Sequence, residues 1–534
     1  MNNYIKIIGI ALVGFLSFTS CDSGLEDINI NPNEPEIVPT HTIFNRATRR
    51  VMDNTRDSWM GARLTQPWMQ YTAQINYVEE DKYEYRPPTA QTGWDQLYIA
   101  ANNFKAIIDF CEDPQTASTM EASGNLQNQI AASRVMLAYT FLMLTEHFGD
   151  VPYYSYGSDD ADFQALQLSE GVLNPVYASQ SKIYADLLKE LREANDQFVL
   201  GETVFVSGDG IYNGNAEKWK KFANSLRLRI ANRVKDVMPS AVSEMNDAVS
   251  DGVFTSNDDN AAQSYGASAS EGNPFWAAFF VDNRTDFAVN DQFVKLLQGV
   301  GETLPARGAS SSFYGPDPRL QKMVAPIGLT KEQVTSGNYE ESDDISNYQG
   351  MPYALPEDRL SSNNAIAGLS FVSQTILSAN HPEMLMEYAE VEFILSEMNG
   401  WSQMHYEAGV RASMERWGVS DTDASEYIAN LPAANEEHVI TQKYIALFMQ
   451  SQEAWSEYRR TGYPDSDILL LPGQTSTEID GTPYVFVPLE DIDDIPYRIR
   501  YPEGEQSLNR ANWSAAVANL SNGDNLDSKL WWMP

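Results

Sequence analysis

Apolar residues recur at helical spacing along most of the chain from about Phe44 onward. The clearest stripe consists of Trp94, Leu97, Tyr98, Ala101, Phe104, Ile107 and Ile108, whose intervals are typical of one helix face. Stripes of the same kind at 183–194 and 219–234 predict two more amphipathic helices. Between Val135 and Leu144 only Thr140 is polar, and a helix that is apolar on nearly all sides is expected at the centre of a fold.

Further helical stretches fall at about 286–298, 384–398, 403–416 and 436–459. Small residues such as Ala131, Ala138 and Ala223 lie where paired helices would have to cross. The pattern predicts an all-α body of tetratricopeptide-like helical hairpins, which stack because one hairpin cannot bury its apolar face alone. The sequence contains no clean 34-residue repeat, so this prediction depends on the helix pattern.

Two long segments, about 252–283 and 300–380, are rich in Gly, Ser, Asn and Pro and lack the periodicity of regular helices. Loops of this length are usually functional or disordered, so we expect two long loop insertions in the helical domain. The stretch P-Y-V-F-V-P from Pro483 to Pro488 predicts a short strand between prolines.

The amino-terminal apolar run, from Ile7 to Phe18, is too short to span a bilayer, which takes about 20 apolar residues. It predicts a cleaved signal peptide over residues 1–20. Residues 21–40, rich in Asn and Pro, then form a tether, and residues 41–534 form a single helical domain.

One of the two cysteines, Cys21, follows Thr19 and Ser20 directly behind this apolar run. The arrangement resembles the bacterial lipoprotein pattern, in which the cysteine is acylated and becomes the first mature residue, although Phe18 is a mild departure. Two or more acyl chains give stable anchoring, so this lipid would be the only membrane contact. The alternative is an incidental cysteine near an ordinary cleavage site. Cys111, left without a partner, is expected to be a small buried apolar residue.

The chain carries 36 basic and 74 acidic side chains, for a net charge of −38. Nucleic acid is excluded as a partner, because binding phosphates needs basic patches. Arg227, Arg229 and Arg233 cluster on one predicted helix whose other side is apolar, so we expect them to form internal ion pairs.

The sequence contains none of the metalloprotease, serine-hydrolase, nucleotide-binding or paired-cysteine motifs. The acidic loops at 257–260 and 491–494 could hold a structural calcium ion, but neither matches the spaced calcium-binding loop, so solvated charge is the preferred interpretation and no cofactor or metal is predicted. A glycoside hydrolase or lyase stays an alternative, because it needs only two suitably placed carboxylates.

Aromatic side chains in loops are the remaining candidates for a binding site. The candidates form two clusters, Phe275, Trp276, Phe279, Asn283 and Arg284 in one and Tyr77, Tyr83 and Arg86 in the other. Flat rings offer a large apolar face, and neighbouring amides and guanidinium groups offer hydrogen bonds, which suits a pocket that holds a sugar or peptide without reacting with it. Each ring could instead pin a loop to the helical body.

Several motifs follow one another along nearly the whole chain. They are I-N-P-N-E-P at 30–35, H-F-G-D-V-P-Y at 147–153, W-K-K-F-A-N-S-L-R-L-R-I-A-N-R at 219–233, D-P-R-L at 317–320, the run 440–464 that contains Q-E-A-W-S-E-Y-R-R-T-G-Y-P, and R-I-R-Y-P-E-G-E-Q-S-L-N at 498–509. This ordered set resembles the SusD/RagB surface lipoproteins of Bacteroidetes, in particular their second SusD-like group.

The resemblance implies an all-helical, SusD-like body with a loop-rich ligand-binding face, anchored on the cell-surface side of the outer membrane. It also implies a partner, a SusC-like TonB-dependent transporter, on which the protein sits as a hinged lid. The ligand is expected to be an oligosaccharide, with peptide capture as the alternative, and the work is binding rather than catalysis. Most of the motif residues have architectural roles, and Glu505 is expected to pair with a buried arginine.

Overall fold

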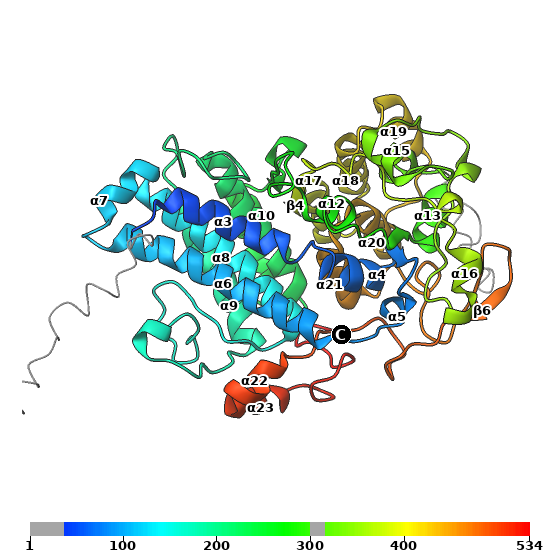
Figure 1. Cartoon of the computed structure of the whole chain (residues 1–534). Helices are drawn as coiled ribbons and strands as arrows, with labels where there is room; N and C mark the ends of the chain where they lie inside the picture. Colours follow the sequence, from blue (N-terminus) through cyan, green and yellow to red (C-terminus); the bar gives the residue numbers. More distant parts are fainter. Residues whose placement is uncertain (1–36, 300–315) are drawn as a thin grey trace, which may run out of the picture. The chain divides into compact units, whose positions relative to one another are not determined.

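Paired helices build the first half of the described chain, each packing against the next one in sequence (Figure 1). They are α3 Thr40–Asp53, α6 Pro87–Glu112, α8 Leu126–Phe148, α9 Gln180–Gln197, α10 Ala216–Val234 and α11 Ala241–Asp251. The computed structural model describes residues 37–299 and 316–534. The predicted signal peptide, Cys21 and most of the tether therefore lie outside the described residues.

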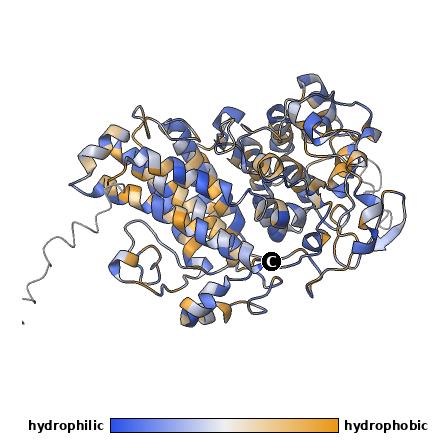
Figure 2. Cartoon of the chain, viewed as in Figure 1, coloured by the Kyte–Doolittle hydropathy of each residue, from blue (hydrophilic) through white to orange (hydrophobic). Residues whose placement is uncertain are grey.

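Helix α8 is the most deeply buried of this group. All of its residues from Asn128 to Phe148 are buried, as its apolar sequence predicts. The Asn125 side chain caps its start by accepting a hydrogen bond from the Asn128 N–H, and Gly149 ends it with a φ of 103°. Its neighbours carry hydrophobic and hydrophilic residues along the same helix (Figure 2), as amphipathic helices do.

A second group of helices follows near the carboxyl-terminal end. It contains α17 Tyr388–Met398, α18 Gln403–Arg416, α19 Asp421–Ala429, α20 Glu436–Ala446 and α21 Ser451–Thr461. The single helix predicted over 436–459 is thus two helices, because the chain turns at 447–450, where Met449 has a φ of 71°. Gly462 ends α21 in the left-handed conformation, which glycine adopts without steric cost. The helical fold class is confirmed.

Buried ion pairs join the two groups of helices. Arg233 on α10 pairs with Glu146 on α8 at 2.9 Å and with Glu453 and Glu457 on α21 at 2.5 Å each. Arg229 pairs with Glu390 on α17, and Arg227 with Glu244 on α11. The predicted internal use of the three arginines is confirmed. Removing one partner of such a buried pair typically costs about 3–5 kcal/mol.

The strands of the described residues form three two-stranded antiparallel sheets. β1 Thr72–Gln74 pairs with β3 Phe287–Val289, β2 Ala261–Gln263 with β4 Glu383–Met386, and β5 Thr475–Thr477 with β6 Pro483–Val485. The helices predicted over 286–298 and 384–398 are therefore too long, since each begins with a strand that pairs with a distant segment. The predicted strand at 483–488 is confirmed but ends at Val485.

The two predicted loop insertions contain more regular structure than expected. Besides strand β2 they hold the short helices α12 Pro274–Phe280, α14 Leu320–Met323, α15 Lys331–Ser336 and α16 Leu360–Asn363. Local capping explains α12, because the Asn273 side chain accepts hydrogen bonds from the N–H groups of Phe275 and Trp276, and Pro274 occupies the first turn. Residues 300–315 lie outside the described range.

Short elements complete the described chain. They are the π-helical turn η1 Gly61–Thr65, the helices α4 Gln66–Trp68, α5 Val78–Asp81, α7 Ala117–Met120, α13 Asp291–Gln298, α22 Glu503–Leu508 and α23 Arg510–Val517, and 3₁₀ turns at 121–123, 168–170, 257–259, 345–347, 357–359 and 366–368. None of the helices described here is both long and apolar enough to cross a membrane.

Polar residues near the carboxyl terminus pair differently from the prediction. Glu505 accepts a hydrogen bond from the Tyr177 hydroxyl at 2.6 Å, so the expected pairing with a buried arginine is wrong. Arg498, which is fully buried, pairs instead with Asp524 at 2.6 Å. Cys111 is buried, as predicted.

Candidate functional site

The pairing of β1 with β3 brings one residue of each predicted aromatic cluster together, Tyr77 and Arg284. Tyr77 follows β1, and Arg284 precedes β3 in the other cluster. The strands pair Gln74 with Phe287, and the Ile75 N–H donates to the Asp286 carbonyl at 2.7 Å beyond the end of the ladder. Side chains about 200 residues apart in sequence thus reach one place on the surface.

Four side chains form an aromatic and basic surface that we call the ledge: Trp59, Arg63, Tyr77 and Arg284. The Arg63 guanidinium lies 4.5 Å from the ring centroid of Trp59 and 5.2 Å from that of Tyr77. Arg284 lies 5.6 Å from the Trp59 ring. Trp59 is 40% exposed and Tyr77 43%, so both rings present open surface next to fixed positive charge.

Buried carboxylates hold Arg63 in place. Its two terminal nitrogens pair with Glu80 at 3.3 Å and Asp286 at 3.2 Å, and Asp286 also accepts a hydrogen bond from the Asn76 amide at 3.0 Å. Burial raises the pKa of Glu80 to about 7, although the nearby arginines oppose that rise. A guanidinium fixed by two acids is a rigid support for the two rings.

A cavity of about 510 Å³ adjoins the ledge, with Trp59 in its wall. It is also lined by Asp57, Glu84 and Arg86 and by the first turn of α6. Arg86 pairs with Glu80 at 2.8 Å and with Glu84 at 2.7 Å, so Glu80 connects the cavity to the ledge. A volume of this size is typical of small-molecule sites.

The turn that carries Trp59 is fixed by Asp57. One carboxylate oxygen of Asp57 accepts hydrogen bonds from the N–H groups of Trp59, at 3.0 Å, and Met60, at 2.8 Å. Burial raises the pKa of Asp57 to about 6 against these hydrogen bonds. Asp57 and Glu84 both line the cavity, but the first holds a turn and the second pairs with Arg86, so both have structural partners.

Several predicted site residues lie elsewhere. Phe275 and Phe279 are buried and pack against each other with ring centroids 5.3 Å apart, and Tyr83 is buried against Phe486. These three rings cannot contact a ligand in this structure. Their burial corresponds to the loop-pinning role that the sequence left open.

The other two residues of the 275–284 cluster lie at the surface. Trp276 is half-buried, with its ring centroid 5.8 Å from that of Phe280. Asn283 is exposed and accepts a hydrogen bond from the Lys331 ammonium at 3.1 Å. Of the predicted site residues, Tyr77 and Arg284 therefore belong to the ledge, and Arg86 lines the adjoining cavity.

Sequence reasoning missed Trp59 and Arg63. The only local signal is D-S-W-M-G-A-R, a tryptophan in a polar and glycine-containing stretch with an arginine four residues later. Trp59 lies in the turn before η1 and Arg63 lies on η1, and the contact between them becomes visible only in the structure.

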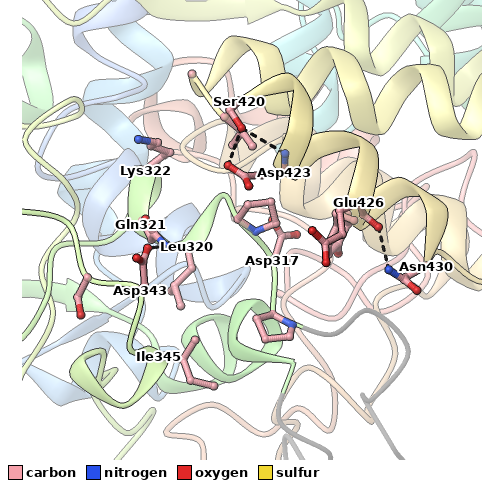
Figure 3. A pocket seen from close by; sticks show the side chains of 16 residues that line it. Asp317, Leu320, Gln321, Lys322, Asp343, Ile345, Ser420, Asp423, Glu426 and Asn430 are labelled. Atoms are coloured by element: carbon pink, nitrogen blue, oxygen red, sulfur yellow. Dashed lines mark hydrogen bonds between the residues drawn. The ribbon is translucent and has the colours of Figure 1, made fainter.

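A larger hollow, of about 790 Å³, lies between α19 and the segment 316–322 (Figure 3). Its wall is rich in acids, among them Asp343, Asp423 and Glu426. Asp423 accepts a hydrogen bond from Ser420 at 2.6 Å and Asp343 from Gln321 at 3.0 Å. Tyr427 is the one aromatic residue that lines it among residues 37–299 and 316–534, and because Tyr427 is buried, these residues place no open ring face in the hollow.

The comparisons with known proteins point in one direction. Residues 32–502 match the model of the second SusD-like family, described as "Starch-binding associating with outer membrane". No curated protein matches the chain.

Solved structures match over nearly the whole chain. A chitin-binding protein is 24% identical, with a TM-score of 0.70 over 92% of this chain and 99% of its own. A Bacteroidetes SusD-like protein is 21% identical, with a TM-score of 0.71 over 93% and 100%. A SusD homolog from Parabacteroides distasonis is 22% identical, with a TM-score of 0.70 over 92% and 98%. At 21–24% sequence identity, the structural similarity establishes the fold and nothing beyond it.

Proposed function

Because the chain belongs to the SusD-like family, we propose that it is a cell-surface lipoprotein that captures an oligosaccharide and delivers it to a SusC-like TonB-dependent transporter. Acylated Cys21 anchors the protein in the outer membrane, and the ledge with its adjoining cavity binds the sugar. The protein then acts as a lid on the transporter barrel and leaves the ligand unaltered.

The observation that carries the proposal is the pair of exposed rings, Trp59 and Tyr77, supported by one buried arginine. The CH-rich face of a sugar ring packs on an aromatic ring, and its hydroxyl groups accept hydrogen bonds from guanidinium groups. A support that is already rigid loses little conformational entropy on binding. This favours binding without chemistry, and it favours a glycan over a peptide.

A binding experiment with the mature protein, lacking residues 1–20, tests the proposal. Calorimetry against a glycan panel and a peptide library should give saturable binding to glycans without product formation. Trp59→Ala and Tyr77→Ala should each weaken binding about ten-fold or more, which corresponds to about 1.4 kcal/mol. Trp531→Ala is the matched control, since Trp531 is 36% exposed but lines a different hollow. Product formation would support a hydrolase or lyase, and binding of peptides alone would support peptide capture.

The transporter partnership needs a separate test in the native host. Mild detergent extraction and affinity purification of the tagged lipoprotein should bring down a TonB-dependent barrel in stoichiometric amount. Purification of the protein alone, under conditions that preserve other outer-membrane complexes, would contradict a lid function.

A further inference from the structure

Arg284 is held in a defined position by the end of α12. The N–H groups of Val281 and Asp282 donate to the Ala277 carbonyl at 2.8 Å and 3.0 Å, and the Arg284 N–H donates to the Ala278 carbonyl at 2.7 Å. Asn283 adopts a φ of 54°, the left-handed conformation with which helices commonly end. The backbone therefore fixes where the arginine leaves the surface.

The guanidinium of Arg284 has donors to spare. Among the described residues its one carboxylate neighbour is Asp286, with 3.9 Å between Nη1 and Oδ2, which is too long for a hydrogen bond. Asp286 already accepts from Arg63 at 3.2 Å and from Asn76 at 3.0 Å. Arg86, in contrast, pairs with two carboxylates at 2.8 Å and 2.7 Å. The Arg284 side chain is 37% exposed and lies beside the exposed ring of Trp59.

A free guanidinium beside an exposed ring has a chemical preference. Its planar donors match the two oxygens of a carboxylate, and the charge-assisted pair is about twice as strong as a hydrogen bond between neutral groups. Building on the proposed function, we infer that the captured oligosaccharide is acidic, and that Arg284 binds the carboxylate or sulfate of the sugar that packs on Trp59.

The protein's net charge of −38 does not oppose this assignment at short range. Salt at physiological ionic strength screens charges beyond about 8 Å, so only the nearest groups act on a bound anion. Around the ledge these include Arg63, Arg86 and Arg284, which face Glu80, Glu84 and Asp286. Arg63 and Arg86 engage these acids, and the nearby Asp57 accepts hydrogen bonds from the N–H groups of Trp59 and Met60, which leaves the charge of Arg284 for a ligand.

Paired probes isolate the acidic group. Oligogalacturonides, glucuronoxylo-oligosaccharides and sulfated galacto-oligosaccharides are each compared with their carboxyl-reduced or desulfated forms by calorimetry. At least one acidic member should bind about ten-fold more tightly than its neutral partner. Arg284→Gln should remove that preference, and Arg284→Lys should keep part of it because the charge stays and the planar fork is lost. Arg411→Gln is the matched control, since Arg411 is exposed and its guanidinium contacts only the Ser425 hydroxyl among the contacts of the described residues.

Each outcome decides one question. Equal binding of both members of every pair, or binding of neutral glycans alone, overturns the acidic ligand and leaves glycan capture standing. A preference for the acidic member that survives Arg284→Gln, with an unchanged melting temperature, overturns the assignment to Arg284. If no glycan binds and short peptides bind only when their carboxyl terminus is free rather than amidated, the ligand is a peptide. Arg284 then binds its terminal carboxylate, and the assignment to a sugar is wrong. Absence of binding to every probe overturns the proposed function as well.

Discussion

Replacing Arg63 by methionine tests whether this arginine supports both the fold and the ledge. Methionine keeps an unbranched apolar stem but removes the guanidinium that lies against Trp59 and Tyr77 and pairs with Glu80 and Asp286. Removing one partner of a buried ion pair costs about 3–5 kcal/mol, because the other charge is left uncompensated. Each acid keeps a second partner here, so we expect a value near the lower end.

The cost should depend on pH because Glu80 can take up a proton. Burial raises the pKa of Glu80 to about 7, so the folded protein binds this proton more tightly than the unfolded chain. The stability that the protonated group contributes is present at low pH and is lost as the pH rises through about 7. Arg63 is the main group that opposes this rise, so its removal raises the pKa of Glu80 further, and the carboxyl is neutralised more completely at pH 6 than at pH 9. We expect Arg63→Met to cost about 3 kcal/mol at pH 9 and about half as much at pH 6.

Thermal melting followed by circular dichroism measures this difference. Unfolding entropy is about 2.1 cal/mol/K per residue, or about 1 kcal/mol/K for some 500 residues, so the melting temperature should fall by about 3 °C at pH 9 and 1–2 °C at pH 6. Adding Glu80→Gln to Arg63→Met should recover part of the loss at pH 9, while glycan binding stays weak. Equal losses at both pH values, or normal glycan binding by Arg63→Met, would refute the reasoning.

Three further predictions concern acid stability, packing and anchoring. Burial alone would raise the pKa of Glu397, but ion pairs with Arg460 and Lys235 lower it to about 2. The stability that the charged carboxylate contributes is therefore complete above about pH 4.5 and is lost as the pH falls toward 2. The difference in melting temperature between wild type and Glu397→Gln should disappear over that range. Phe279→Ala should lower the free energy of unfolding by about 3–5 kcal/mol because the ring is fully buried. Calorimetry should show this as a fall of several degrees in the melting temperature, and an unchanged melting temperature would contradict a packing role. Cys21→Ser should move the protein from the membrane to the soluble fraction and abolish labelling by radioactive palmitate, and retention in the membrane would argue against the lipid anchor.

The helical body could be predicted from the sequence because its signal is local. The stripe from Trp94 to Ile108 needs only the helical period to be recognised, and all of its apolar members except the half-buried Tyr98 are buried in α6. The strands at 287–289 and 383–386 could not be predicted in this way, because what stabilises three or four residues is a partner strand far away in the chain.

The candidate site was predicted only in part, for a related reason. Phe275 and Phe279 lie four residues apart on α12, so they share one helix face, and that face packs on the core. Without the short helix in the prediction, all aromatic residues of the loop were equivalent. Trp59 acquires its significance only when the strand pairing brings Tyr77 and Arg284 together, which no local pattern of residues reveals.

Under the proposed role of Arg284, the turn that carries it determines the choice of ligand separately from the stability of the protein. It leaves α12 and enters β3 within a few residues, and its tip at 281–283 is exposed. Exchange of residues 281–284 between relatives can therefore replace the group presented beside Trp59 while the helices and Asp286, which pairs with Arg63, stay in place. Under the proposed function, a lineage that encounters new polysaccharides can change its ligand through this turn while the scaffold is inherited unchanged.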